Sequence, residues 1–370
     1  MSILLSIFYF FYFSIVGVYI IFLPKVLATI GYSATEIGII FATAPMVRFL
    51  LPFAFIKGLK LDARAFNIAL LFMLFSSISF YFTKDNFVNL LLSNIGMGIG
   101  LSLILPYIEV IALEEIGKQK YGKIRLFGSI GFVLVALVLV KYLDSTDIAF
   151  FFLMTLAFLT SIFAFMIVKN SHHVKTEKES SPTNDINILK DWSLWLGLTL
   201  MQVSFGSFYN FFTIYETDFG VSLDMTIYLW SFGVLAEIIM LYFQGKLLSK
   251  NLLLILQISI LLTAIRWFLV FLYPQNLGMM FFAQAIHAFS FALFHSTTIV
   301  YLFGLYKHRS LAQQFFLGIT YGFGGFLGAL IAGYVYEHIP TYLFLSSSFL
   351  AMGSFVFIYI WSNSQQSGSR

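Results

Sequence analysis

Residues 169–190, KNSHHVKTEKESSPTNDINILK, separate two long series of apolar segments. This stretch combines charged residues with Ser, Asn and Pro, a composition that is typical of flexible linkers. Six apolar runs precede this stretch and six follow it. A membrane-spanning helix needs roughly 20 mostly apolar residues, and the runs have about that length. The sequence therefore predicts an all-α membrane protein with twelve transmembrane helices in two pseudo-symmetric six-helix halves.

The predicted spans are the apolar runs between polar breaks. In the first half they are about 3–23, 35–56, 65–82, 87–116, 122–142 and 147–168. In the second half they are about 191–215, 223–245, 251–272, 276–303, 311–335 and 341–362. The expected organisation is an N-terminal six-helix bundle, a cytoplasmic linker, a C-terminal six-helix bundle and a cytoplasmic tail, at 1–168, 169–190, 191–363 and 364–370.

Composition supports a membrane protein and argues against other classes. The chain is 60% hydrophobic and 10% charged, whereas soluble domains carry about 25% charged residues. The net charge of +4 does not indicate nucleic-acid binding, because most of the basic residues lie between apolar runs on one predicted side of the membrane. The chain has no Cys, which excludes disulfides and thiol chemistry. The first apolar run has no basic segment before it and no small-residue cleavage site, so we expect a retained helix rather than a removed signal peptide.

Lys and Arg residues in the short loops predict the orientation, because cytoplasmic loops carry the excess of them. Sixteen of these residues fall on one predicted side, and the other side has Lys25, Lys84 and Lys141. The less basic side also carries several acidic residues, namely Asp144, Asp147, Glu216, Asp218 and Glu337. We therefore expect a multi-pass protein of the bacterial inner membrane with the linker and both termini in the cytoplasm.

Ionisable side chains inside a spanning helix are costly unless they are paired or hydrated, so each is a candidate functional residue. The candidates are Arg48, Glu109, Glu237, Arg266, His287 and His295, with Arg125 at the start of the fifth span. Glu109 and Arg125 lie at similar depths in adjacent antiparallel helices, so they can form a carboxylate–guanidinium pair. Such a pair could bind substrate, which is the interpretation that we favour, or it could be a structural ion pair or a gate.

Glu237 is the candidate proton carrier, because a low-dielectric cavity favours a neutral carboxyl group. A carboxylate that is permanently paired with an arginine is the alternative, and Arg266 lies on the adjacent helix. Helix 2 corresponds to helix 8 under the expected pseudo-symmetry, so Arg48 and Glu237 could face one cavity.

His287 is expected near the midplane of the membrane, where it could bind substrate or relay protons. His295 is expected nearer the cytoplasm, where it more simply bonds a neighbouring helix. The two histidines are eight residues apart, which is about 12 Å along a helix. One metal ion cannot bind both on a straight helix, so no metal site is predicted.

Several motifs resemble one family. Residues 121–132, YGKIRLFGSIGF, resemble a segment of the phenylpropionate permease-like family of the major facilitator superfamily and, more distantly, of lactose permease. The segments PYIE at 106–109 and YLWSFGVLAE at 228–237 are similar to helices 4 and 8 of that family. Arg266-Trp267 is similar to its helix 9, and Gln284-x-x-His287 with His295 is similar to its helix 10. The matches follow one another in order through most of the chain.

The resemblance implies roles for individual residues. Glu109 and Arg125 match the pair that holds the sugar in lactose permease. Phe132 falls where that permease stacks a Trp on the sugar ring, and Phe is a poorer platform for a disaccharide. Helix 10 has no acidic residue after either His, unlike lactose permease, so proton coupling here would use another group.

The expected function is proton-coupled symport, the uptake of a small organic solute such as an aromatic carboxylate by alternating access. Uptake of a nucleoside or sugar, and proton-driven efflux of drug-like molecules, are the alternatives. Substrate binding is assigned to Glu109, Arg125, Phe132 and His287, and proton coupling to Glu237, Arg266 and His287. We expect no enzyme activity and no cofactor, because the sequence shows no clustered acid–base or metal groups. The expected partners are the substrate, the proton and the lipid bilayer, without nucleic acid, and the resemblance implies a monomer.

Overall fold

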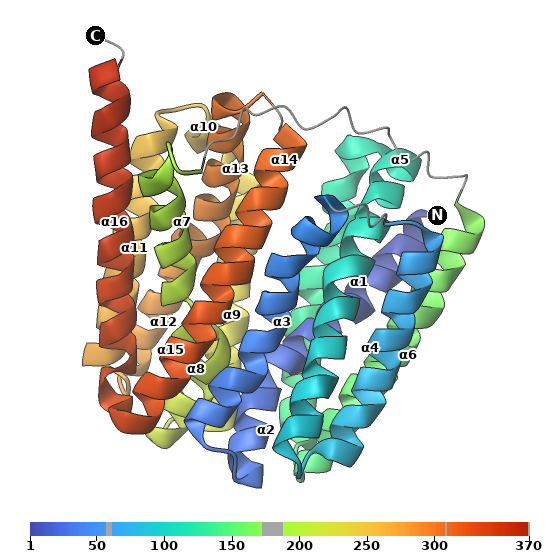
Figure 1. Cartoon of the computed structure of the whole chain (residues 1–370). Coiled ribbons are helices and arrows are strands. Elements are labelled where there is room, and N and C mark those ends of the chain that lie inside the picture. The colour runs from blue at the N-terminus through green and yellow to red at the C-terminus, as the bar shows by residue number, and fades with distance from the viewer. Residues whose placement is uncertain (57–60, 172–187, 308, 369–370) are drawn as a thin grey trace. The chain divides into compact units, whose positions relative to one another are not determined.

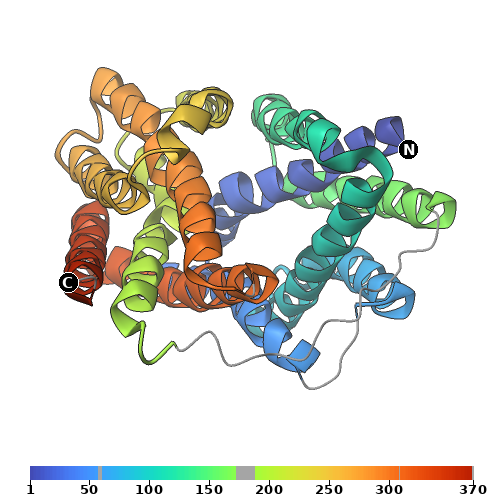
Figure 2. The same cartoon turned by 90° about the horizontal axis from the view of Figure 1, so that it is seen from above.

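The computed structural model describes residues 1–56, 61–171, 188–307 and 309–368, which are helical apart from short connections (Figure 1). The chain divides into two compact units, unit 1 (Met1–Ser180) and unit 2 (Ser181–Arg370). Seen from above in Figure 2, the helices of each unit are gathered into a bundle. Most of the predicted linker at 169–190, and the end of the predicted tail at 369–370, lie outside the described residues.

Unit 1 supplies six apolar spans within its described ranges. The first span, Ser2–Ile30, is built from α1 (Ser2–Gly17), the π-helical η1 (Val18–Phe22) and α2 (Leu23–Ile30). The others are α3 (Ala34–Ile56), α4 (Ala63–Thr83), two segments of α5 (Phe87–Tyr142) and α6 (Thr146–Asn170). The first span was predicted to end near residue 23, but the helical segment continues to Ile30. Pro24 lies in the first turn of α2, where a proline is tolerated and the helix continues.

Gly117 divides α5 into the fourth and fifth spans, Phe87–Gly117 and Lys120–Tyr142. Its φ of 71° and ψ of 160° are not helical, and glycine adopts positive φ at little cost because it has no Cβ. A continuous helix would separate Glu109 from Arg125 by about 24 Å along its axis. The two side chains are in contact, so the chain doubles back at this glycine.

The connection into α4 is fixed by an N-cap. The Asp62 carboxylate accepts hydrogen bonds of 2.9 Å from the backbone N–H groups of Ala65 and Arg64. These bonds, the one from Ala65 first, lower the pKa of Asp62, because they favour its ionised form. The cap satisfies N–H groups that a helix start otherwise leaves unpaired.

Unit 2 supplies five long spans and one interrupted helix within its described ranges. The interrupted helix consists of α7 (Trp192–Ser204) and α8 (Gly206–Asp218), which meet at Phe205 and together cover the predicted span 191–215. The remaining elements are α9 (Leu223–Phe243), α10 (Gly245–Leu248), α11 (Leu252–Leu272), α12 (Leu277–His287), η2 (Ala288–Leu293), α13 (Phe294–Leu305), α14 (Arg309–Phe315), η3 (Phe316–Gly324), α15 (Gly325–His338), η4 (Pro340–Tyr342) and α16 (Leu343–Gly368). Eleven long spans and the interrupted helix confirm the twelve-helix prediction.

Glycines permit a close helix crossing in each unit. In unit 1, a Cβ on Gly131 would clash with the backbone carbonyl of Phe10 in α1. In unit 2, a Cβ on Gly206 would clash with the backbone of Gly328, so α8 and α15 touch along their main chains. Small residues allow this approach in membrane helices. The first helix of each unit is thereby packed against the fifth, as the predicted pseudo-symmetry requires.

Candidate functional site

The predicted intramembrane residues fall into two clusters, one in each unit. Unit 1 carries Arg48 on α3 and Glu109, Arg125 and Phe132 on α5. Unit 2 carries Glu237 on α9, Arg266 on α11, His287 on α12 and His295 on α13.

In unit 1, Glu109 and Arg125 form the expected pair. The Nε of Arg125 donates to Oε1 of Glu109 at 3.3 Å, and the hydroxyl of Tyr121 donates to the same oxygen at 2.8 Å. The Arg125 guanidinium lies 5.3 Å from the ring centroid of Phe13, within the range of a cation–π contact. The side chains of Arg125 and Glu109 are 44% and 29% exposed, so the pair can be reached from outside the unit.

The other two residues of unit 1 lie near this pair in different ways. Phe132 follows Arg125 by seven residues, which places both on one face of the helix. Its ring is half-buried, and its backbone packs against Gly17 of α1. Arg48 is exposed and forms no ion pair within the described parts of the chain.

In unit 2, Arg266 is enclosed completely, with 0% of its surface exposed. Its Nη2 donates to Oε1 of Gln284 at 2.9 Å, and its Nη1 contacts Nδ1 of His287 at 2.9 Å. Nη1 also donates to Oγ of Ser290 at 3.2 Å. All three partners are neutral acceptors, and no carboxylate of the described residues lies within 4.0 Å of this guanidinium.

The contact with Arg266 fixes the tautomer of His287. A guanidinium has only donors, so Nδ1 of His287 must accept and the ring proton must be on Nε2. That Nε2 lies 3.9 Å from Oε2 of Glu237, too long for a hydrogen bond but close enough for electrostatic attraction. The pairing of Glu237 with Arg266 that the sequence left open is therefore indirect, with an imidazole ring between the two charges.

Aromatic rings enclose the Arg266 cluster. The guanidinium carbon lies 4.4 Å from the centroid of Phe208 and 4.3 Å from that of Trp267. The ring of His287 is stacked on Phe291, with a centroid distance of 5.4 Å and an interplanar angle of 7°. These rings exclude water, which strengthens every electrostatic interaction inside the cluster.

Breaks in the helices position the cluster. The π-helical η2 begins directly after His287, and α7 and α8 meet at Phe205, beside Phe208. Such π-turns are rare and often mark functional sites, because they rotate the side chains that follow. Gly233, one turn before Glu237, leaves the space that Gln284 and His287 fill, since a Cβ there would lie 3.1 Å from Oε1 of Gln284.

His295 belongs to a separate contact. Its Nδ1 is hydrogen-bonded to the hydroxyl of Tyr321 at 2.8 Å, and its ring packs against Phe316. It therefore bonds a neighbouring helix. No set of three or more His, Asp or Glu residues within the described ranges could hold a metal ion.

Sequence reasoning assigned no role to Tyr121, Ser290 or Phe208. Gln284, His287 and Ser290 are spaced three residues apart. This spacing puts all three on one helix face. Polar residues at this spacing in an apolar span were the available signal. Tyr121 is the first residue of the motif at 121–132, and its bond to Glu109 depends on the turn at Gly117, which the motif does not predict.

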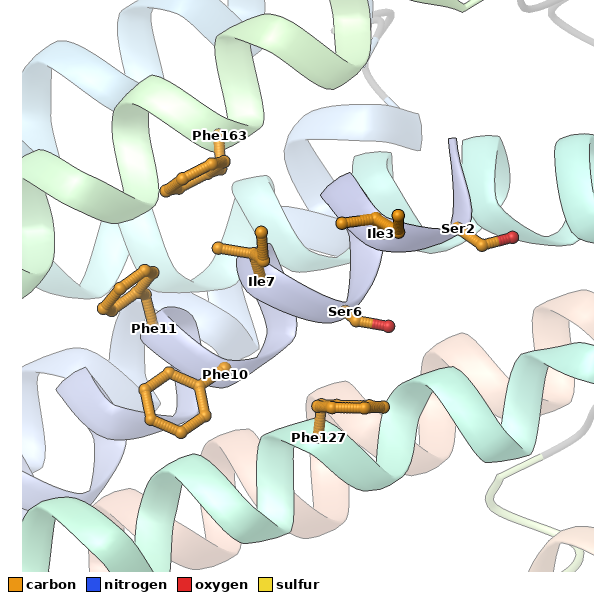
Figure 3. Close-up of a pocket in the computed structure, with 8 residues that line it drawn as sticks. All are labelled: Ser2, Ile3, Ser6, Ile7, Phe10, Phe11, Phe127 and Phe163. Atoms are coloured by element: carbon orange, nitrogen blue, oxygen red, sulfur yellow. The ribbon is translucent and has the colours of Figure 1, made fainter.

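One pocket of unit 1 contains none of these residues (Figure 3). It lies between α1, α5 and α6, and its walls include Ile3, Ile7, Phe10, Phe127 and Phe163. Figure 3 shows Phe127 on one side of α1 and Phe163 on the other. The pocket has no charged group, so it does not suit an anionic substrate.

Comparisons with known proteins agree with this fold. Residues 2–346 match the MFS_1 like family. The chain is 24% identical over 367 residues to a protein of Escherichia coli (strain K12) named "Probable 3-phenylpropionic acid transporter", covering 93% of each chain.

Among solved structures, the chain is similar to the nucleoside transporter NupG, with a TM-score of 0.78, 18% identity and 98% coverage of each chain. It is also similar to a D-xylose–proton symporter, with a TM-score of 0.71, 12% identity and coverage of 97% of this chain and 96% of that one. At these identities the solved structures show the fold alone. The family match extends over most of the chain, and the protein therefore belongs to the MFS_1-like family of major facilitator transporters.

Proposed function

We propose that this transporter is a proton-coupled symporter that takes up a small organic acid, with Glu237 as the carboxyl that carries the proton. The observation that carries the proposal is the row of contacts from Arg266 through His287 to Glu237. It joins a buried cation to a carboxyl group through a neutral imidazole. Intramembrane carboxyl groups in such positions are typical of proton relays in transporters.

The contact between His287 and Glu237 explains how binding of a proton could change the interaction between α9 and α12. The Nε2–H of His287 can donate to Glu237 when the carboxyl is ionised, and closing the 3.9 Å gap would make that bond. Protonation of Glu237 removes the negative charge and with it most of the attraction. Binding or release of one proton would thus alter the packing between α9 and α12.

The substrate class follows from the charge of Arg266. Its contacting partners are neutral, so unit 2 holds a buried positive charge that a substrate carboxylate would neutralise. The name of the Escherichia coli relative, a probable 3-phenylpropionic acid transporter, supports an aromatic carboxylate. In unit 1, we propose that Glu109 and Arg125 bind polar groups of the substrate and that Phe132 contacts its ring.

The proposal includes the location and the topology. We place the chain in the bacterial inner membrane with both termini in the cytoplasm, on the asymmetry of Lys and Arg in the loops. Residues 169–190 would connect the two halves on that side, and the working form would be a monomer.

Purified protein in liposomes that contain a pH-sensitive dye tests the proposal. Adding 3-phenylpropionate outside should acidify the interior of wild-type liposomes and should fail to do so with Glu237→Gln. The matched control is Glu114→Gln, which changes an exposed carboxyl on α5 and should behave like wild type. A nucleoside or xylose that moves protons in place of the acid would contradict the substrate class. Uptake of the acid without a proton signal in wild type would contradict the coupling.

A further inference from the structure

A second carboxyl group of unit 2 is buried without a partner. Glu216 lies in the last turn of α8, and 0% of its surface is exposed. Figure 1 shows α8 toward the end of unit 2 that is away from the C-terminus. Neither carboxyl oxygen of Glu216 has a hydrogen-bond partner among the described residues. The span predicted at about 191–215 ends one residue before Glu216, whereas α8 runs on to Asp218.

Two titratable side chains, Tyr215 and Asp218, lie within two residues of Glu216 on α8, and the hydroxyl of Tyr215 also has no hydrogen-bond partner among the described residues. The ring of Tyr215 packs 4.8 Å from Phe344 of α16 and 4.5 Å from Phe219. Asp218 accepts a hydrogen bond of 2.7 Å from Tyr336 of α15.

The remaining carboxyl and imidazole groups at this end of unit 2 are exposed and make no hydrogen bond or ion pair with Glu216. They are Asp224 in the first turn of α9, and Glu337 and His338 at the end of α15. His338 is bonded instead to the carbonyl of Tyr334. Among the described residues, no cation reaches Glu216 from α9, α15 or α16.

An ionised carboxylate in this place would lack water, hydrogen bonds and a counter-charge. Burial of an unpaired charge costs many kcal/mol, whereas a buried neutral polar group costs only a few. The packing seen here can therefore hold the neutral acid but not the carboxylate.

We propose that Glu216 is a second proton-binding carboxyl group, protonated in this packing and ionised only when the end of α8 opens to water. Release of its proton would favour that opening. The opening of the end of α8 would then depend on the pH of the compartment that it faces. This proposal does not depend on Glu237 or on the identity of the substrate.

Infrared difference spectroscopy of the full chain in nanodiscs, titrated from about pH 5 to about pH 9, tests the proposal, since buried glutamates can titrate in this range. The wild type should show a protonated-carboxyl band that is missing in Glu216→Gln and retained in Asp218→Asn. Asp218 is the matched control, because it lies two residues away and is exposed. Glu237→Gln separates the two carboxyl groups, because the Glu216 band should persist in it whether or not Glu237 couples protons to transport.

Thermal melting provides a second readout. Raising the pH should lower the melting temperature of wild type and of Asp218→Asn more than that of Glu216→Gln. Absence of a band specific to Glu216, or equal pH dependence in all variants, would overturn the proposal. A melting temperature that depends on Na⁺ rather than on pH would overturn it too, because the ligand would then be a metal cation. If neither Glu216→Gln nor Glu216→Met folds, a charged side chain is required and the proposal is wrong.

Discussion

Arg125 in unit 1 and Arg266 in unit 2 both lie in apolar spans, yet the protein surrounds them differently. Arg125 is 44% exposed and meets a carboxylate directly, at 3.3 Å. Arg266 is fully enclosed and meets neutral acceptors, with the carboxylate of Glu237 one imidazole ring away. An exposed pair contributes little to stability, whereas a buried guanidinium depends on each of its hydrogen bonds. In unit 1 the ion pair can separate at low cost, whereas separating Arg266 from its partners in unit 2 would leave buried polar groups without hydrogen bonds.

The largest expected effect comes from removing Arg266, and Arg125 is its counterpart in unit 1. Arg266→Ala should lower the free energy of unfolding by about 3–5 kcal/mol, because it leaves buried acceptors unpaired and a cavity among aromatic rings. Arg125→Ala should cost about 1 kcal/mol or less, because its partner remains hydrated. Unfolding by increasing mole fraction of SDS in mixed micelles measures both. Equal losses of unfolding free energy in the two variants would show that the burial of Arg266 does not increase its contribution to stability.

The next effect concerns the glycine crossings, in which the two units are alike. Gly131→Ala in unit 1 and Gly206→Ala in unit 2 should each destabilise the protein by about 1–3 kcal/mol, because the new methyl group meets backbone rather than a movable side chain. Gly122→Ala is the control, since a Cβ there has nothing within 4 Å. The same unfolding assay applies. A loss in only one unit would show that the crossings are not equivalent.

Two variants of His287 separate its contacts. His287→Asn keeps an oxygen near Nη1 of Arg266 but loses the group that faces Glu237. His287→Gln can place an amide N–H near Glu237 but leaves Arg266 without that acceptor. We expect His287→Gln to lose about 1–2 kcal/mol more stability, since a buried donor is left unpaired. His287→Asn should instead slow proton-coupled uptake about tenfold, which corresponds to 1.4 kcal/mol in the barrier.

The stability and the uptake rate are measured for both His287 variants. If both variants lose stability and uptake to the same extent, His287 acts only by filling space. The separation of the two effects would support its role between Arg266 and Glu237.

Much of the fold could be predicted because apolar length and loop charge report on the membrane directly. The pair of Glu109 and Arg125 was also predictable, because antiparallel neighbouring helices bring residues of equal depth together. The partners of Arg266 were not, since they depend on which faces of α11 and α12 meet and on the π-helical turn after His287. Hydropathy predicts neither the helix faces that meet nor the position of the π-helical turn. The burial of Glu216 was not predicted, because the predicted span ended at about residue 215 and hydropathy does not report which face of a helix end is packed.

The smallest expected effect comes from removing one tyrosine hydroxyl in each unit. In unit 1, Tyr121 donates to the carboxylate of Glu109 at 2.8 Å. In unit 2, Tyr321 is bonded to the ring of His295 at 2.8 Å. Hydrogen bonds to charged groups are roughly twice as strong as those between neutral groups. Because the carboxylate of Glu109 is partly exposed, Tyr121→Phe should cost only about 1 kcal/mol and Tyr321→Phe about half as much.

A double-mutant cycle measures the energy of the hydrogen bond between Tyr121 and Glu109. Tyr121→Phe combined with Glu109→Gln should cost less than the sum of the single changes, because both remove one charged hydrogen bond. Additive losses would mean that Tyr121 stabilises unit 1 through its ring rather than through its hydroxyl. The carboxylate of Glu109 would then be held mainly by Arg125. A substrate that displaced Arg125 would have to neutralise Glu109 as well, so the result would bear on the order in which the unit 1 pair opens.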